Sequence, residues 1–230
     1  MSITKSLAKT ITNYENQKSL GSKLRTKRIA PLLRVIERLS QEYGFVNIID
    51  VGGTEEYWGI VPQGFLEKHN VKITVVNLPE TRQSKNHDSF EFVHSDGCNL
   101  AEFQDNSFHI AHSNSVIEHV GDWSRVIQFS EELKRVAQKH FVQTPNFWFP
   151  IEPHCMVPFF DWLPKPIRIW LVMKFSLGNW NKASSIDEAM QTIESARLLT
   201  RKMFSALFSD SEILTERFLF LPKSFIAMRN

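Results

Sequence analysis

Four short groups of polar residues and glycines stand out in this chain of 230 residues, because each directly follows an apolar segment. They are Asp50-Val51-Gly52-Gly53-Thr54, Asn77-Leu78, Asp96-Gly97-Cys98 and the run 113–120, which contains Asn114 and His119. Glycine lets a ligand approach the backbone closely, whereas carboxylate and amide groups hydrogen-bond to ribose hydroxyls and to an adenine amino group. The four groups therefore indicate a nucleotide-like ligand.

Each group also fits a simpler interpretation when it is taken alone. A pair of glycines serves many strand-to-helix turns, and Asn77 and Asp96 are ordinary turn residues. Serine, asparagine and glutamate around His119 fit the hydrogen-bond network that opens a helix. A ligand site is indicated only if the fold brings the four groups together in order.

The apolar segments before these groups read as buried strands. Strands are predicted over 45–51, 71–76, 90–93, 107–113 and 140–143, with a closing pair over 213–220 and 224–229. Helices are predicted over 29–40 before Gly44, from the N-cap Asp122 to about 138, and from a capping box at 185–188 toward 208, with a weaker candidate over 55–69.

Strands and helices alternate through residue 143, which predicts an α/β fold with a doubly wound, mostly parallel seven-stranded sheet. The closing strands are expected to pair antiparallel at the sheet edge. Ligands of such sheets bind at the carboxyl ends of the strands, where the four groups fall. We expect a basic N-terminal arm over 1–28 and a single domain over 29–230, with an insertion or lid at about 146–210.

In order and spacing, the set resembles the class I, Rossmann-like methyltransferases that depend on S-adenosylmethionine, and most nearly the group called methyltransferase type 11. The similar stretches are Ile49-Asp50-Val51-Gly52-Gly53, Val76-Asn77-Leu78, Ser95-Asp96-Gly97, the run 113–120, Leu133-Lys134-Arg135-Val136 and Thr144-Pro145-Asn146. The resemblance covers roughly residues 29–146 and the tail 218–229. It implies a Rossmann-like methyltransferase fold and S-adenosylmethionine as the cofactor.

The resemblance also implies roles for single residues. Asp50, Gly52 and Gly53 would hold the methionine part of the cofactor, and Asn77 and Leu78 its ribose and one adenine face. Asp96, Gly97 and Cys98 would read the adenine edge, whereas Asn114 would line the floor near the sulfonium. Two departures weaken the expected affinity: Thr54 and Glu56 replace the second and third glycines of the pattern, and Asn77 replaces an acid.

A methyl acceptor with a weakly acidic hydroxyl or amine needs a general base. The candidates are His154, His119 and Glu152. His154 ranks first, because it follows the fifth strand within 146–154, where an inserted segment folds over the methyl group. The alternative is a structural histidine in a proline-rich loop.

The segment 147–175 alternates aromatic residues and prolines with Lys165, Arg168 and Lys174. It fits a lid that buries its apolar face on the core, which is the simpler interpretation. It also fits an interfacial segment that makes peripheral contact with an anionic bilayer, with a lipid-linked or glycan acceptor. The basic residues at 18–28 fit a solvated helix face, or a cation that pairs with the cofactor or the acceptor.

Composition narrows the function further. A net charge of +2 gives no reason to expect a nucleic-acid partner, and 42% hydrophobic residues support a folded core. The two cysteines have no metal or disulfide spacing, so no metal is predicted. Without a signal-like start or a membrane-length apolar run, a cytoplasmic protein is expected, with contact at the inner face of the membrane as an extension.

The predicted function is methyl transfer to an oxygen or nitrogen of a small-molecule, saccharide or lipid-linked glycan acceptor. The competing hypothesis is a Rossmann-like protein that binds S-adenosylmethionine without turnover, as the departures at Thr54, Glu56 and Asn77 suggest. A nicotinamide-dependent dehydrogenase is disfavoured because the glycine turn lacks the G-x-G-x-x-G spacing. Neither the acceptor nor an oligomeric state follows from the residues.

Overall fold

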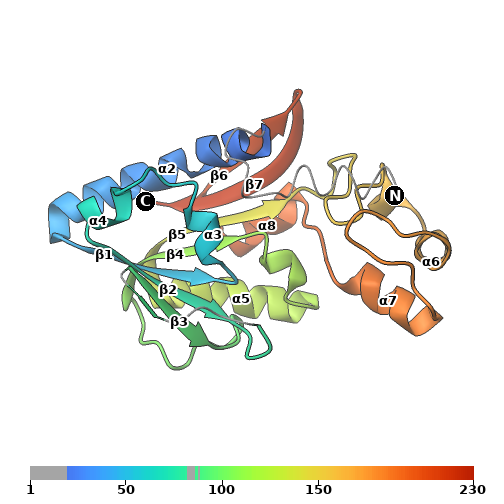
Figure 1. Ribbon diagram of the computed structural model, residues 1–230, viewed down its shortest axis with the longest axis horizontal. Coiled ribbons are helices and arrows are strands. Elements are labelled where there is room, and N and C mark those ends of the chain that lie inside the picture. The colour runs from blue at the N-terminus through green and yellow to red at the C-terminus, as the bar shows by residue number, and fades with distance from the viewer. Residues whose placement is uncertain (1–19, 82–85, 88) are drawn as a thin grey trace.

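A seven-stranded sheet forms the centre of the molecule in the computed structural model, which describes residues 20–81, 86–87 and 89–230 (Figure 1). The strand order is β3-β2-β1-β4-β5-β7-β6, and β7 runs antiparallel to both of its neighbours. The strands are β1 (Val46–Val51), β2 (Val71–Asn77), β3 (Phe90–His94), β4 (Phe108–Asn114), β5 (Ala137–Pro145), β6 (Glu212–Phe218) and β7 (Leu221–Arg229). The predicted doubly wound sheet with an antiparallel pair at its edge is therefore confirmed.

Helices cover both faces of the sheet and enclose one apolar core on each side. The helix α2 (Leu20–Tyr43) lies along one face with the short helices α3 (Glu55–Trp58) and α4 (Phe65–Lys68) (Figure 1). The helices α5 (Trp123–Val136) and α8 (Arg201–Leu207) pack on the other face. Burial on both faces explains why the central strands are nearly continuous apolar runs.

The first helix is longer than its apolar spacing predicts. It begins at Leu20, so the boundary expected at residue 28 falls inside α2, whereas residues 1–19 of the predicted arm lie outside the described residues. Gly44 ends the helix with a φ of 79°, as expected. The cap at Asp122 is confirmed as well, because its side chain accepts a hydrogen bond from the Arg125 amide.

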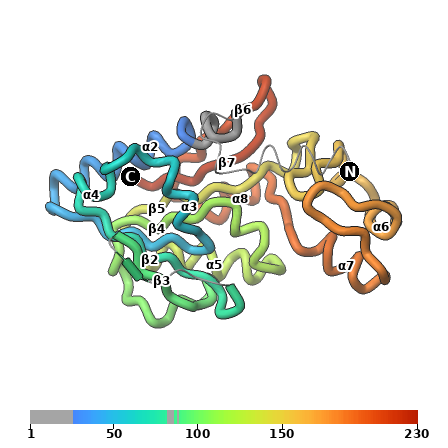
Figure 2. Tube along the Cα trace, viewed as in Figure 1, coloured from blue at the N-terminus to red at the C-terminus, as the bar shows by residue number. Residues whose placement is uncertain are grey.

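The insertion after β5 forms a separate helical part with its own small core. It contains the 3-10 turn η2 (Phe160–Trp162) and the helices α6 (Lys165–Lys174) and α7 (Ile186–Glu194). Figure 2 shows the chain passing from β5 into this part and returning to the sheet at α8. Its buried residues are Cys155, Phe160, Val172, Ala183, Ala189 and Ile193. The independently packed part is therefore narrower than the predicted lid at 146–210.

The single helix predicted from the capping box at 185–188 toward residue 208 is wrong in its length. Ser185 caps α7 as expected, but α7 ends at Glu194, and α8 starts again behind the cap Thr200. Between them the backbone pairs with distant segments, since the Arg197 amide donates to the Glu118 carbonyl and Leu199 accepts from the Phe147 amide. These tertiary hydrogen bonds replace the helical ones, and the buried Leu199 anchors the break.

A buried histidine beneath α8 makes the stability of the fold depend on pH. His140 on β5 is 1% exposed, and its Nε2 lies 2.6 Å from the Ser211 hydroxyl. Burial lowers the pKa of His140 from 6.5 to about 4. The unfolded chain therefore binds a proton more readily than the folded one between these values, so stability is retained above pH 6.5 and falls as the pH drops toward 4.

We expect His140→Phe to flatten this part of the pH profile. The phenyl ring keeps the contact with Phe208 but cannot take up a proton. The free energy of unfolding of the wild type should fall by about 3 kcal/mol more than that of the variant over this range. Urea unfolding at several pH values measures it, and parallel profiles for the two proteins would contradict the prediction.

Candidate functional site

All four predicted groups of polar residues meet at the carboxyl edge of the parallel strands. The Gly52 amide donates to the Val76 carbonyl at 2.7 Å, and the Ser95 amide donates to the Asn77 carbonyl at 2.9 Å. The Ser113 hydroxyl donates to the Val51 carbonyl at 2.9 Å, which joins the end of β4 to the end of β1. The edge is therefore continuous from β3 to β4, where doubly wound sheets bind ligands.

The glycine turn after β1 has a shape that only glycine allows. Gly52 has a φ of 76°, and a Cβ there would lie 2.5 Å from the methyl groups of Val116. A Cβ at Gly53 would overlap the Asp50 carboxylate. Packing of the turn against Val116 and Asp50 therefore requires glycine at both positions, even though Thr54 and Glu56 replace the later glycines of the family pattern.

Asp50 lies beneath this turn, with no exposed area. Its carboxylate accepts a hydrogen bond of 2.8 Å from the Trp58 indole and lies 2.6 Å from Nδ1 of His112. It therefore supports the turn from below, in place of the direct contact with the methionine part that the resemblance implies. Sequence reasoning missed Trp58 and His112, although a histidine within an apolar strand is a signal that a partner lies nearby.

Asn77 ties the end of β2 to the glycine turn. Its Nδ2 donates to the Gly53 carbonyl at 2.9 Å. The amide group therefore uses its donor within the protein, and its Oδ1 is the atom that can accept from a ribose hydroxyl. The neighbouring Leu78 is half exposed, as its predicted contact with an adenine face requires. An acid at position 77 could not make the bond to Gly53, which explains the departure from the family pattern.

Asn77→Asp is expected to lower the free energy of unfolding by about 1–3 kcal/mol, because a carboxylate would face the Gly53 carbonyl without a hydrogen to donate. Asn77→Ala is the matched control, since it removes the bond without placing a charge there. Chemical denaturation should rank wild type above Asn77→Ala and Asn77→Asp. An Asn77→Asp protein as stable as the wild type would refute this account of the residue.

The group Asp96-Gly97-Cys98 contains an ion pair that the sequence did not reveal. The Asp96 carboxylate accepts from Nη2 of Arg125 at 2.8 and 2.9 Å and from the Cys98 amide at 2.9 Å. Desolvation opposes ionisation of Asp96, but the bonds from Arg125 and the Cys98 amide outweigh it and lower its pKa. An adenine amino group would therefore share this carboxylate with Arg125.

The two residues after Asp96 face the core rather than solvent. A Cβ at Gly97 would lie 2.6 Å from Val51 and 2.7 Å from Phe129. The Cys98 thiol is buried and lies 3.4 Å from the Arg125 carbonyl, and burial raises its pKa to about 11. The Asp96 carboxylate and the backbone of this group, and not the thiol, are thus the parts that a cofactor could meet.

Asn114 is held by a network that reaches from α2 to β6. Its Oδ1 accepts from Nη1 of Arg28 at 2.9 Å, and the same guanidinium forms an ion pair of 2.8 Å with Glu216. The Ser224 hydroxyl also donates to Glu216. The Arg28 side chain is only 9% exposed. The expectation of a solvated helix face is therefore wrong for Arg28, because its charge is neutralised inside the fold.

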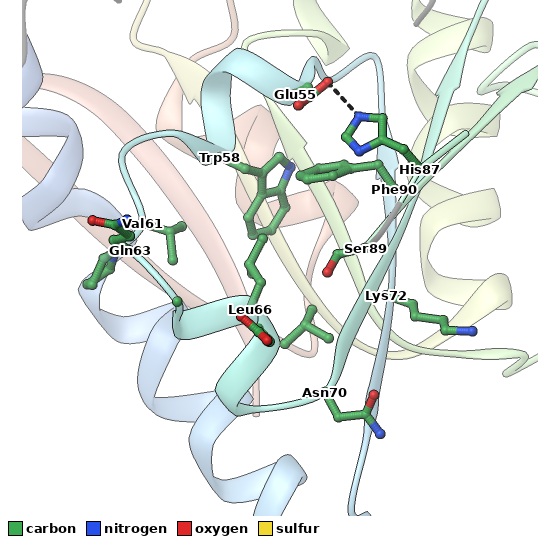
Figure 3. A pocket seen from close by; sticks show the side chains of 14 residues that line it. Glu55, Trp58, Val61, Gln63, Leu66, Asn70, Lys72, His87, Ser89 and Phe90 are labelled. Carbon is green, nitrogen blue, oxygen red and sulfur yellow. Dashed lines mark hydrogen bonds and ion pairs between the residues drawn. The ribbon is translucent and has the colours of Figure 1, made fainter. Parts of the chain in front are cut away.

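The cavity of about 730 Å³ in Figure 3 lies away from these groups. It is bounded by α3, α4 and the amino ends of β2 and β3, with the Glu55–His87 ion pair at one end and Asn70 at the other (Figure 3). None of the predicted cofactor or catalytic residues lines it. Ligands of doubly wound sheets bind at the opposite ends of the strands, so this cavity does not lie at the edge where such ligands bind.

The three residues predicted as catalytic lie together beyond β4 and β5. Nδ1 of His154 lies 2.5 Å from the Glu152 carboxylate, and Nε2 of His154 lies 3.0 Å from Nε2 of His119. Nδ1 of His119 lies 2.7 Å from the Ser195 carbonyl. The turn η1 (Ile117–His119) after β4 supplies His119, and the loop after β5 supplies the other two.

The electrostatics of the two rings differ. Desolvation opposes protonation of His154, but the hydrogen bond and the charge of Glu152 outweigh it and raise the pKa of His154. Desolvation dominates at His119, whose pKa is lowered despite the bond to the Ser195 carbonyl. Glu152 is 3% exposed and accepts from the backbone amides of His154 and Cys155, so it orients the ring and also closes the loop.

Glu118 is a fourth member of this cluster, and the prediction of catalytic residues missed it. Its side chain is 1% exposed, and the Thr144 hydroxyl at the end of β5 donates to its Oε2 at 3.0 Å. Burial raises its pKa to about 7. Glu118 stands directly before His119 in the run 113–120, so the signal was a carboxylate adjacent to a candidate base.

One family model and several solved structures are similar to this chain. Residues 51–140 match a family model that is described as a methyltransferase domain. The carbon methyltransferase CurJ shares the fold, with a TM-score of 0.53 at 9% identity over 90% of this chain and 54% of that one. An O-methyltransferase family protein from Burkholderia thailandensis gives a TM-score of 0.47 at 13% identity over 97% of this chain and 67% of its own. No curated protein sequence matches.

The chain is shorter than several of these proteins. It spans 59% of a candidate O-methyltransferase from Nostoc punctiforme, with a TM-score of 0.43 at 13% identity over 94% of this chain. The family match begins at Val51 of the glycine turn and ends at His140 on β5. S-adenosylmethionine is the cofactor of this family, and the glycine turn at the carboxyl end of β1 fits it. Residues 51–140 therefore match a methyltransferase domain, and the sheet has the order of the Rossmann-like methyltransferase fold.

Proposed function

We propose that this protein transfers a methyl group from S-adenosylmethionine to an oxygen or nitrogen atom of a small-molecule, saccharide or lipid-linked glycan acceptor. The observation that carries the proposal is the convergence of Glu152, His154 and His119 beside the strand ends that face the cofactor edge. A protein that only bound the cofactor would have no need for oriented imidazoles there.

The cofactor supplies an activated methyl group, and the protein supplies binding and alignment. The Gly52-Gly53 backbone would hold the methionine part, Asn77 would accept from the ribose, and the backbone at Asp96 and Gly97 would face the adenine. Asn114, locked by Arg28, would form the floor of the reacting centre. The Asn77 side chain is bonded to the Gly53 carbonyl, which supports the proposal that these two parts act together.

The imidazole pair would act on the acceptor. Glu152 fixes the ring of His154, so that Nε2 points to the side where His119 lies. When the pair is neutral, an Nε2 lone pair can take the proton that a hydroxyl loses as it is methylated, or the proton that the methylated ammonium loses after a neutral amine has attacked. The exposed side of His119 leaves access for an acceptor from solvent.

Calorimetric titration with S-adenosylmethionine and S-adenosylhomocysteine, followed by a methyl-donor assay across acceptor classes, tests the proposal. We expect both ligands to bind and one polar acceptor class to be methylated. Binding without turnover on any class would favour the competing hypothesis of a cofactor-binding protein. Absence of binding by both ligands would refute the cofactor site itself.

The helical insertion supports a second, finer proposal: peripheral contact with a membrane through 147–175. The apolar face of the insertion packs on its own core, yet several large apolar side chains stay at least 37% exposed, namely Trp148, Ile151, Phe159, Trp162, Ile167, Trp170 and Phe175. Lys174 and the ion pairs Lys165–Glu194 and Arg168–Asp161 stand in the same segment. Aromatic and basic residues together suit the headgroup region of an anionic bilayer. No helix in the described part of the chain is long and apolar enough to span a membrane.

Vesicle co-sedimentation tests this contact. We expect more protein to sediment with vesicles that contain phosphatidylglycerol than with phosphatidylcholine alone, because Lys174 adds electrostatic attraction and an anionic headgroup can compete for Lys165 with the exposed Glu194. Replacing both Trp148 and Trp170 by serine should reduce binding severalfold. The matched control replaces Leu219 and Phe220, which are exposed on the turn between β6 and β7. Equal sedimentation of wild type and the double tryptophan variant would refute the contact.

A further inference from the structure

Three side chains in the proposed acceptor site converge as metal ligands do. Glu118, His119 and His154 each offer one atom, and these atoms all lie within 4.8 Å of one another. Glu118 and His119 come from the turn after β4, whereas His154 comes from the insertion. A metal ion bound by all three would therefore join the insertion to the sheet.

The hydrogen-bond partners of the two rings determine where their protons lie. Nδ1 of His154 faces the Glu152 carboxylate, and Nδ1 of His119 faces the Ser195 carbonyl. A carbonyl and an ionised carboxylate only accept, so each Nδ1 carries a hydrogen. In the neutral rings, both Nε2 atoms then present lone pairs, and these two atoms lie 3.0 Å apart. Two facing lone pairs need a cation between them, either a proton or a metal.

The surroundings of Glu118 favour a metal ion over a shared proton as the cation between the two rings. The side chain is 1% exposed, and its Oε2 accepts from Thr144. Its Oε1 is buried and has no hydrogen-bond partner among the described residues. A buried carboxylate oxygen without a partner is costly, because it has lost its water and gained nothing in return. A proton shared by the rings would leave Oε1 unsatisfied, whereas a metal ion can use a carboxylate oxygen as its third ligand.

We propose that Glu118, His119 and His154 bind a divalent transition-metal ion, with zinc as the best match. Two imidazoles and one carboxylate form a known catalytic zinc set that keeps a fourth position open. Tetrahedral coordination at usual Zn–N lengths would hold the two Nε2 atoms about 3.3 Å apart, close to the spacing present. The Nδ1 bonds to Glu152 and Ser195 are the outer contacts that orient such histidines.

The site gives the acceptor a second way to lose its proton. A hydroxyl in the open position would have its pKa lowered by the ion and would release its proton to solvent, so the imidazoles would hold the metal in place of acting as bases. This role rests on the proposed methyl transfer, whereas metal binding itself does not. The sequence alone predicted no metal, because the two cysteines have no metal spacing. The two histidines lie 35 residues apart, so they gave no local signal.

Zinc and cobalt titrations of the full, chelator-treated chain test the site. We expect one equivalent to bind, and Co²⁺ to show the visible absorption of a four-coordinate N/O site. His119→Ala, His154→Ala and Glu118→Gln should each weaken binding at least ~100-fold, and Glu152→Gln, which removes an orienting contact, ~10–100-fold. His87→Ala is the matched control and should bind as the wild type does. Circular dichroism checks that each variant is folded.

Several outcomes would overturn the inference. If the wild type binds neither ion, the two rings share a proton and no metal site exists. If the three ligand variants bind as tightly as the wild type, the ion sits elsewhere. Titration of the same metal-free protein with S-adenosylmethionine separates failure of the metal site from failure of the proposed function. If the cofactor does not bind, the proposed function is refuted, whereas metal binding is unaffected.

Discussion

His154→Asn is expected to reduce methyl transfer by about 10²–10⁴-fold and to leave the affinity for S-adenosylmethionine within about twofold of the wild type. The asparagine amide can still donate to Glu152 in place of Nδ1, so the loop keeps its shape. It has no atom that reaches the position of Nε2, which faces His119. The loss follows whether Nε2 acts as a base or holds a metal ion.

His109→Asn is the matched control for this change. Nδ1 of His109 accepts from the Asn47 amide at 2.9 Å, and an asparagine oxygen can do the same. His109 lies at the amino end of β4, away from the cofactor edge. Turnover assays with the identified acceptor and titrations with the cofactor measure both variants. A His154→Asn enzyme with near-normal turnover would remove this residue from the reaction.

Asp50→Ala is expected to lower the free energy of unfolding by about 3–5 kcal/mol, since it leaves two buried donors without an acceptor. The Trp58 indole and the His112 ring both depend on this carboxylate, and Asp50 and His112 are fully buried. His112 stacks on Phe141 in the core, so it cannot turn toward solvent without disrupting the packing. Loss of activity in this variant would therefore report misfolding as well as a damaged cofactor site.

Asp105→Ala gives the comparison for a surface carboxylate. Asp105 forms an ion pair with Arg135, but its side chain is 72% exposed, and such pairs contribute at most about 1 kcal/mol. Urea unfolding of both variants at neutral pH measures the difference. If Asp50→Ala costs no more than Asp105→Ala, the carboxylate beneath the glycine turn is not the structural support that we describe.

Local sequence patterns were sufficient to predict most strands of the sheet. The apolar runs that end at Val51 and Asn77 predicted β1 and β2 to within a residue or two, because strands buried on both faces leave little choice of residue. The caps at Asp122 and Ser185 were also predictable from the sequence, because an N-cap is a contact between near neighbours in the chain. The break between α7 and α8 at 195–200 could not be predicted from the sequence, because its backbone hydrogen bonds are made with Glu118 and Phe147, which are far away in the chain.

The glycine turn and the order of the strand-end groups followed from the sequence alone, since each depends on residues a few positions apart. Only the tertiary structure showed that Asp50 supports the turn from below, that Arg28 holds Asn114, and that the Asp96 carboxylate belongs to Arg125. Only the tertiary structure also joins Glu118 and His119 to His154. Periodicity along a chain records burial, whereas the partner of a buried charge is set by the packing of segments far apart in sequence.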